Sequence, residues 1–273
     1  MSEQIQEPLL EVTHLTKCFP VKRSLQEAFS GHKQNIIRAL DDVTFSIYKG
    51  ETLGLVGESG CGKSTLSKTL MRLYKPEQGC ILLDGKIDMT TLNKKDLRNV
   101  RKRMQMVFQD PYSSLNPKMT VRQCFYEVLS VHNICPRQDF EEKSAEILTM
   151  VGMPPDTLNR YPQAFSGGQL QRIGIARALL LQPDLLIADE PVSALDMSVQ
   201  AQIINLLAEL KETLQLTILF ISHDLRMIQY LSDRVIVMHE GRIVEIGETQ
   251  DLFTHPEHSY TRSLLDSLSP DKK

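Results

Sequence analysis

The sequence predicts an α/β fold in which strands and helices alternate around a mostly parallel sheet. Three short apolar runs, at residues 53–56, 185–188 and 217–221, are typical of strands that a parallel sheet buries on both faces. Helical periodicity follows the first two runs, at residues 62–74 and 198–214. Strands that alternate with helices in this way build a layered α/β core.

The chain is expected to open with strands rather than with a helix. Residues 9–19 partly alternate between apolar and polar side chains, which is the pattern of a strand. Residues 22–35 are polar and poorly periodic, so they indicate a loop between two early strands. Further strand-like segments flank Lys49-Gly50, which is a turn signal, and the helix at 62–74 then carries its leucines on one face.

A long helical stretch interrupts the alternation of strands and helices in the middle of the chain. We therefore expect residues 111–165 to form an inserted helical subdomain, in which Gly152 stands where a helix ends. Beyond it, the pattern predicts a helix over 167–181 and a hairpin over 235–246.

Composition excludes several classes of protein. Lys and Arg total 31 against 34 Asp and Glu, so the formal net charge is -3 and nucleic acid is not expected as the main partner. No apolar run approaches the roughly 18 to 20 residues of a membrane span, and no secretory signal is visible at the N-terminus. The 5 cysteines form no CxxC pair, which favours a reduced cytosolic compartment.

A glycine-rich loop is the strongest local signal. Residues 57–65 read GESGCGKST, which satisfies G-x-x-x-x-G-K-[ST] between a buried strand and a helix. The glycines let backbone N–H groups turn toward a polyphosphate, Lys63 can bridge the β- and γ-phosphates, and Ser64 can ligate Mg²⁺. The residues expected to bind the nucleotide are Gly57, Ser59, Gly60, Cys61, Gly62, Lys63, Ser64 and Thr65.

Two carboxylates end a second buried strand. Asp189 follows an apolar run and can hold Mg²⁺ through water, as the Walker B aspartate does in P-loop NTPases. Glu190, the next residue, can act as general base toward the attacking water. A strand that simply ends in solvated acids is the alternative, and the phosphate loop earlier in the chain favours the metal-and-base interpretation.

Residues 165–169, Phe-Ser-Gly-Gly-Gln, resemble the LSGGQ signature of the ATP-binding cassette (ABC) ATPases, with Phe in place of the first Leu. At a helix N-terminus, Ser166 and the glycine amides form a second anion site. One chain has only one γ-phosphate to bind. The resemblance implies that these residues contact ATP held by a partner subunit, in a head-to-tail dimer. The partner-site residues are then Ser166, Gly167, Gly168, Gln169 and Asp196.

Other motifs of that family occur in order. Gln109 resembles the Q-loop glutamine, which senses Mg²⁺ and water, and His223 resembles the switch histidine that contacts the γ-phosphate. Asp196 belongs to a D-loop-like run, and Phe19 stands where the family has an aromatic residue that stacks on adenine. Taken singly, each has an ordinary alternative: a loop amide, a histidine after a strand, a helix N-cap for Asp196 and a core residue for Phe19.

The resemblance also implies an architecture. It is an α/β P-loop NTPase (RecA-like) core with a mixed sheet, an N-terminal antiparallel β subdomain and an inserted α-helical subdomain. The nucleotide-binding core would comprise residues 1–110 and 166–248, the helical subdomain residues 111–165, and a family-type tail residues 249–273.

Two segments resemble the ATPases of oligopeptide, dipeptide and nickel importers, namely residues 108–117 and the tail segment 252–265. A third, Arg160-Tyr161-Pro162, resembles the corresponding run of importers rather than the glutamate-bearing motif of exporters. The resemblance implies a second ATPase subunit in a homodimer or heterodimer, two integral membrane permease subunits and an extracytoplasmic solute-binding protein. No cysteine follows Cys135, so the iron–sulfur cluster that some members carry is not expected.

The sequence therefore predicts an ATP- and Mg²⁺-dependent ATPase that drives uptake of a peptide, of nickel or of a metal chelate. Its expected location is peripheral, on the cytoplasmic face of the membrane. The alternatives are an ABC subunit for another small solute, a soluble ABC ATPase of cofactor assembly, and a P-loop kinase or GTPase. The last of these leaves the signature, the D-loop and His223 unexplained.

Overall fold

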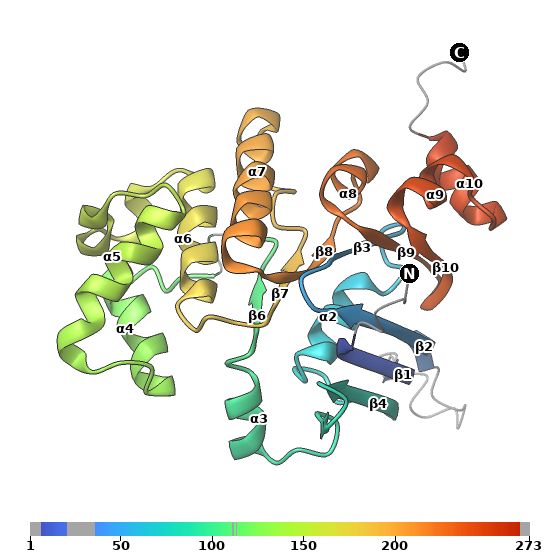
Figure 1. The fold of residues 1–273 in the computed structure, drawn as a ribbon, viewed down its shortest axis with the longest axis horizontal. Coiled ribbons are helices and arrows are strands. Elements are labelled where there is room, and N and C mark those ends of the chain that lie inside the picture. Colours follow the sequence, from blue (N-terminus) through green and yellow to red (C-terminus); the bar gives the residue numbers. More distant parts are fainter. Residues whose placement is uncertain (1–6, 21–35, 111, 113, 268–273) are drawn as a thin grey trace, which may run out of the picture.

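In the part of the chain that the structure describes, the strands form two sheets, and helices cover them (Figure 1). The computed structural model describes residues 7–20, 36–110, 112 and 114–267. The loop predicted at 22–35 lies outside these described residues.

The larger sheet has six strands in the order β10-β9-β3-β8-β7-β6, and only β10 runs antiparallel to its neighbour. This mixed, mostly parallel sheet confirms the predicted fold class. Each strand predicted from an apolar run is present, and the predicted hairpin is β9 with β10. The bounds are β3 (Thr52–Val56), β6 (Met104–Val107), β7 (Leu185–Asp189), β8 (Thr217–Ile221), β9 (Arg234–His239) and β10 (Arg242–Glu248).

The smaller sheet is antiparallel and is built from the N-terminal part of the chain, as the resemblance implied. Its order is β2-β1-β4-β5. The opening strand extends one residue beyond the predicted segment at each end. The bounds are β1 (Pro8–Pro20), β2 (Ile36–Tyr48), β4 (Gln78–Leu83) and β5 (Ile87–Asp88).

The helix after β3 is shorter than its leucine pattern predicted. It ends at Leu70, because Arg72 adopts a left-handed backbone with φ 54°, and Leu73 is left 50% exposed. Among the described residues, no helix is both long and apolar enough to cross a bilayer. The helices outside the inserted stretch are α2 (Lys63–Leu70), α3 (Lys94–Val100), α6 (Gly167–Leu179), α7 (Met197–Leu214), α8 (Leu225–Leu231), α9 (Thr249–Thr254) and α10 (Ser259–Asp266).

The stretch before α6 is helical, as expected, and packs beside α6 on the side of the molecule away from the antiparallel sheet (Figure 1). Gly152, with φ 70°, follows the end of α5 and lets the chain leave that helix. The elements are α4 (Val121–His132), η1 (Arg137–Asp139), α5 (Phe140–Met150), η2 (Pro155–Asn159) and η3 (Pro162–Ala164).

Alternate residues of the parallel strands enter two different hydrophobic cores. On β8, Ile218 and Phe220 join a core with α4, α5, α6 and α7, whereas Leu219 and Ile221 join a core with α2 and the antiparallel sheet. Because successive side chains of a strand point to opposite faces of the sheet and both faces are buried, every residue along the strand must be apolar. This explains why the strands read as unbroken apolar runs.

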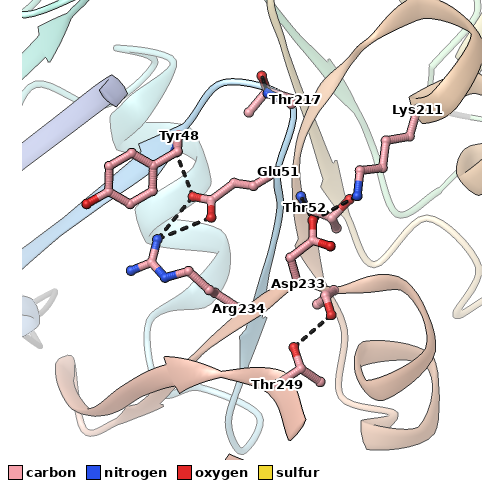
Figure 2. A network of polar contacts seen from close by, with 10 residues as sticks. Tyr48, Glu51, Thr52, Lys211, Thr217, Asp233, Arg234 and Thr249 are labelled. Atoms are coloured by element: carbon pink, nitrogen blue, oxygen red, sulfur yellow. Dashed lines mark hydrogen bonds and ion pairs between the residues drawn. The ribbon is translucent and has the colours of Figure 1, made fainter. Parts of the chain in front are cut away.

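A buried carboxylate joins the two sheets at the amino ends of the parallel strands (Figure 2). The Glu51 carboxylate accepts a hydrogen bond from the backbone N–H of Tyr48 at 2.7 Å and pairs with Arg234 Nη1 at 3.2 Å. Burial raises the pKa of Glu51, and the Tyr48 amide and Arg234 only partly offset this effect. The ionised form is therefore less favourable here than in the unfolded chain.

A second carboxylate in the same view ties β3, α7 and β9 together (Figure 2). Asp233 Oδ2 accepts from the backbone N–H of Thr52 at 2.7 Å and from Lys211 Nζ at 2.8 Å. These bonds hold the start of β3 against α7 and the start of β9.

We expect Glu51→Gln to gain stability relative to the parent chain as the pH rises. Because the pKa of Glu51 is higher in the folded than in the unfolded chain, its stabilising contribution is complete below the unfolded pKa near 4.5 and falls as the pH rises toward the folded pKa. Glutamine has no such ionisation. Denaturant unfolding of both chains between about pH 4.5 and 7 measures the difference. A variant that instead loses relative stability with rising pH would show that Arg234 outweighs burial.

Candidate active site

The carboxyl ends of four neighbouring parallel strands bring most of the predicted site residues to one edge of the larger sheet. The phosphate loop follows β3, Gln109 follows β6, the Asp189–Glu190 pair ends β7, and His223 follows β8. Ligands of open α/β sheets bind outside this edge. The sequence spacing alone could not show that these four segments meet.

Two glycines of the phosphate loop are required by close contacts. A Cβ on Gly57 would lie 2.1 Å from the Met238 carbonyl oxygen, and one on Gly62 would lie 2.5 Å from that of Ala39. Gly62 also has φ 111° and forms the N-cap of α2. The loop therefore packs directly on β9 and β2, with Ser59 and Gly60 exposed above them.

The Lys63 side chain folds back into the loop. Its Nζ donates to the carbonyl oxygens of Gly57 at 2.6 Å and Glu58 at 2.9 Å, and the residue is only 5% exposed. Cys61 is buried beside it, and burial raises the pKa of its thiol. Ser64, the first hydroxyl after the lysine, is exposed, and Thr65 is half-buried.

Asp189 is held by two hydroxyls of α2. Its Oδ2 accepts from Ser67 Oγ at 2.9 Å and its Oδ1 from Ser64 Oγ at 3.3 Å. Burial raises the pKa of Asp189, the two serines lower it, and the charge of Glu190 raises it further. Ser67 was not among the predicted site residues, although it lies three residues after Ser64 and therefore shares its helix face.

Three polar side chains from three different strand ends meet at one carboxylate oxygen. Glu190 Oε2 lies 3.2 Å from Gln109 Nε2, which donates to it, and 3.3 Å from His223 Nδ1. Gln109 and His223 are both exposed, whereas the Glu190 side chain is 18% exposed. The structure thus brings together the three residues that the sequence predicted as catalytic.

The backbone of Glu190 is in the left-handed region, with φ 48°. This conformation costs about 1–3 kcal/mol for a non-glycine residue, so its surroundings must hold it. The Glu190 amide donates to the Ile221 carbonyl at 2.9 Å, and Ser193 Oγ donates to the Glu190 carbonyl at 3.1 Å. A strained backbone of this kind leaves no mark in residue types, so the sequence did not reveal it.

The signature residues form the N-terminus of α6. Ser166 and Gln169 make a capping box, in which each side chain bonds the other's backbone N–H, at 3.4 Å and 3.0 Å. A Cβ on Gly168 would lie 2.3 Å from a methyl group of Val199 on α7, and one on Gly167 would lie 3.1 Å from Leu195. The glycines therefore allow α6 and α7 to pack closely.

Asp196 is the N-cap of α7. Its carboxylate accepts from the Val199 amide at 3.0 Å and from Ser198 Oγ at 2.7 Å, and the Ser198 bond is the main cause of its lowered pKa. The N-cap alternative is thus confirmed as local structure. Among the described residues, no hydrogen bond or ion pair joins Asp196 or the signature to the phosphate loop of the same chain.

Phe19 is a half-buried residue near the end of β1 and does not belong to either hydrophobic core. Its ring meets Tyr74 edge to face, with centroids 5.2 Å apart, and Lys17 Nζ lies 5.1 Å from the ring centre. The core alternative for Phe19 is therefore wrong.

Comparison with known proteins places these motifs in a family. The family described as ABC transporter matches residues 40–193. The oligopeptide transport ATP-binding protein AppF of Bacillus subtilis is 50% identical over 274 residues, which covers 100% of this chain and 82% of that protein. A putative peptide import ATP-binding protein of Brucella ovis is 48% identical over 265 residues, covering 97% of this chain and 80% of that protein.

Solved structures give the same result for the fold. The ATP-binding cassette MJ0796, in a dimeric post-hydrolysis state bound to ADP and Pi, is 28% identical with a TM-score of 0.74, over 88% of this chain and 98% of that chain. The structure of cbiO1 from Clostridium perfringens, part of the transporter complex cbiONQ, is 27% identical with a TM-score of 0.75, over 92% of each chain. From its motifs, its fold and these similarities, the chain belongs to the ABC transporter family.

Proposed function

We propose that this chain is the ATP-hydrolysing subunit of a peptide importer. The observation that carries the proposal is the meeting of Gln109, Glu190 and His223 at one carboxylate oxygen beside the phosphate loop. The relatives named above are peptide transport proteins. This favours peptides over nickel or a metal chelate as the cargo, and transport over soluble cofactor assembly.

In the proposed site, the residues of the phosphate loop bind the nucleotide, whereas Ser64 and Asp189 bind Mg²⁺. Both supply oxygen atoms, which Mg²⁺ prefers, and they already lie 3.3 Å apart. A bound Mg²⁺ would supply positive charge next to the β- and γ-phosphates. Asp189 fits this role, because burial raises the pKa of its carboxyl group and a neighbouring cation would favour the ionised form. Gln109, by its place after β6, would contact the metal or its water.

Glu190 is the proposed general base. Its left-handed backbone directs the carboxylate toward Gln109 and His223, and these two side chains orient it. The carboxylate accepts the proton of the attacking water, while Lys63 and His223 stabilise the negative charge that develops on the γ-phosphoryl group. Phe19 would stack on the adenine ring.

A second copy, or a second ATPase subunit, completes each site in this proposal. Ser166 and Gln169 are exposed at a helix N-terminus, which favours an anion, yet they make no bond to the phosphate loop of their own chain among the described residues. The dimeric state of MJ0796 with ADP and Pi supports a dimer, which this proposal arranges head to tail. The signature and Asp196 would then contact the partner's nucleotide.

A groove lined by Phe108, the residue before Gln109, is the proposed dock for the permease subunits. It has a volume of about 160 Å³ and lies between the strand edge and α6. Leu73 and Phe108, which are 50% and 38% exposed, supply its apolar surface. When the proposed helical subdomain, residues 111–165, moves, the contact at this groove would transmit the movement to the permeases. The chain would thus be peripheral, on the cytoplasmic face of the membrane, with a solute-binding protein on the other side.

Glu190→Gln should retain ATP binding but reduce hydrolysis by about 100-fold or more, because the general base is lost. The closed dimer should accumulate with bound ATP. Phosphate release and nucleotide binding measure the two effects. Glu209→Gln, on the exposed face of α7, is the matched control. Near-normal hydrolysis by Glu190→Gln would exclude Glu190 as the base.

Ser166→Asp should abolish hydrolysis while the isolated chain binds ATP normally. Aspartate caps a helix as well as serine does, but its charge repels the partner's phosphates. Thr120→Asp is the control, since Thr120 and Gln123 form the same capping box on α4. Equal hydrolysis in Ser166→Asp and the parent chain, or equal loss in both variants, would argue against the composite site.

Leu73→Glu should release the chain from membranes that contain the permeases, because a buried unpaired charge opposes docking. ATP binding should be unchanged. Sedimentation of the chain with these membranes measures the effect. Leu214→Glu, which alters a leucine that is 38% exposed at the end of α7, is the control. Normal sedimentation of Leu73→Glu would place the dock elsewhere.

A further inference from the structure

A tyrosine from the C-terminal segment reaches the phosphate loop. The Tyr260 hydroxyl, on α10, accepts a hydrogen bond from the backbone N–H of Glu58 at 3.1 Å. Its ring lies against the ring of His239, the last residue of β9, with centroids 4.0 Å apart and planes inclined by 31°. Tyr260 and Glu58 are about 200 residues apart in sequence, so no local pattern could have suggested their hydrogen bond.

The segment that carries Tyr260 is fastened to the larger sheet. The Glu245 carboxylate, on β10, accepts from the amides of Glu257 at 2.9 Å and His258 at 3.0 Å. His258 Nδ1 then accepts from the Tyr260 amide at 3.2 Å and caps α10. These bonds fix the start of the helix, and therefore the position from which the hydroxyl reaches the loop.

Tyr260 and Lys63 hold opposite ends of one peptide group. In the peptide between Gly57 and Glu58, the carbonyl oxygen accepts from Lys63 Nζ at 2.6 Å and the N–H donates to Tyr260. Glycine places few limits on rotation about its backbone, so a peptide that follows Gly57 can turn over at little cost. Two bonds in opposite directions prevent this rotation.

We propose that Tyr260 is a positioning residue, which fixes the Gly57–Glu58 peptide and so keeps the phosphate loop in the shape that binds a nucleotide. The proposal rests on the proposed role of this loop as the ATP site. Tyr260 acts through the backbone of the loop and takes no part in the chemistry.

The hydroxyl should influence affinity rather than turnover. Without the hydroxyl, the free loop populates other conformations. The apparent affinity for the nucleotide then falls in proportion to the fraction of chains whose loop keeps the binding conformation. From the usual net contribution of one hydrogen bond, the Kd should rise roughly three- to tenfold. Once bound, the phosphates order the loop themselves, so kcat should be nearly unchanged. The binding of ATP and the binding of ADP should be weakened equally, since the loop surrounds phosphates that both nucleotides contain.

Tyr260→Phe tests the proposal, because it retains the ring against His239 and removes only the hydroxyl. Calorimetric Kd values for ATP and ADP, and KM and kcat of the assembled transporter, are the measurements. Tyr230→Phe is the control, since its hydroxyl bonds Asn205 on the surface at 3.0 Å. A rise in Kd and KM with kcat retained supports the proposal. Unchanged Kd values, or a loss confined to kcat or to thermal stability, overturn it.

Two further variants separate the possible failures. Glu245→Ala should raise the Kd of ATP and of ADP by a similar factor. The double variant Glu245→Ala with Tyr260→Phe should raise the Kd little beyond either single variant, because both changes act on one contact. Additive losses would contradict the proposal. Lys63→Ala should abolish ATP binding. If it does so while Tyr260→Phe binds normally, only the role of Tyr260 fails; if Lys63→Ala binds normally, the proposed ATP site fails as well.

Discussion

The parallel hydrogen-bonded register of β3, β8, β7 and β6 is the constraint on which the rest of the structure depends. Leu55 pairs with Ile221, Ile221 with Asp189, and Ala188 with Val107, so all four strands end at nearly the same level. A slip of one residue in any pair would move its terminal side chains by about 3.3 Å and reverse their direction. Such a slip would also exchange the side chains that the two faces of the strand contribute to the two cores.

Polar groups at the two edges of the sheet have different tasks. At the amino edge, the carboxylates of Glu51 and Asp233 accept hydrogen bonds from backbone amides and from the cationic side chains of Arg234 and Lys211. At the carboxyl edge, the Glu190 carboxylate instead contacts the exposed side chains of Gln109 and His223. The fold thus places its structural charges away from its chemistry.

Sequence predicted the fold class and most of the site because these rest on local signals. Buried parallel strands must be apolar, and a phosphate loop needs glycine at fixed positions, so both leave a pattern in residue types. The end of α2 at Leu70 was missed, since leucine spacing continues past the point where Arg72 turns the backbone. Ser67, the strain at Glu190 and the reach of Tyr260 depend on tertiary contacts, which no spacing encodes.

The inward fold of Lys63 means that its charge is in place before a nucleotide arrives. In the free chain, the ammonium group already donates to two loop carbonyls and is nearly buried, so the loop fixes its position. An ammonium group has three N–H donors, and beyond the two carbonyls Lys63 meets, among the described residues, only the Cys61 sulfur, at 3.9 Å. A phosphate oxygen can take this third donor while both loop bonds persist, so binding a nucleotide requires little further ordering of the side chain.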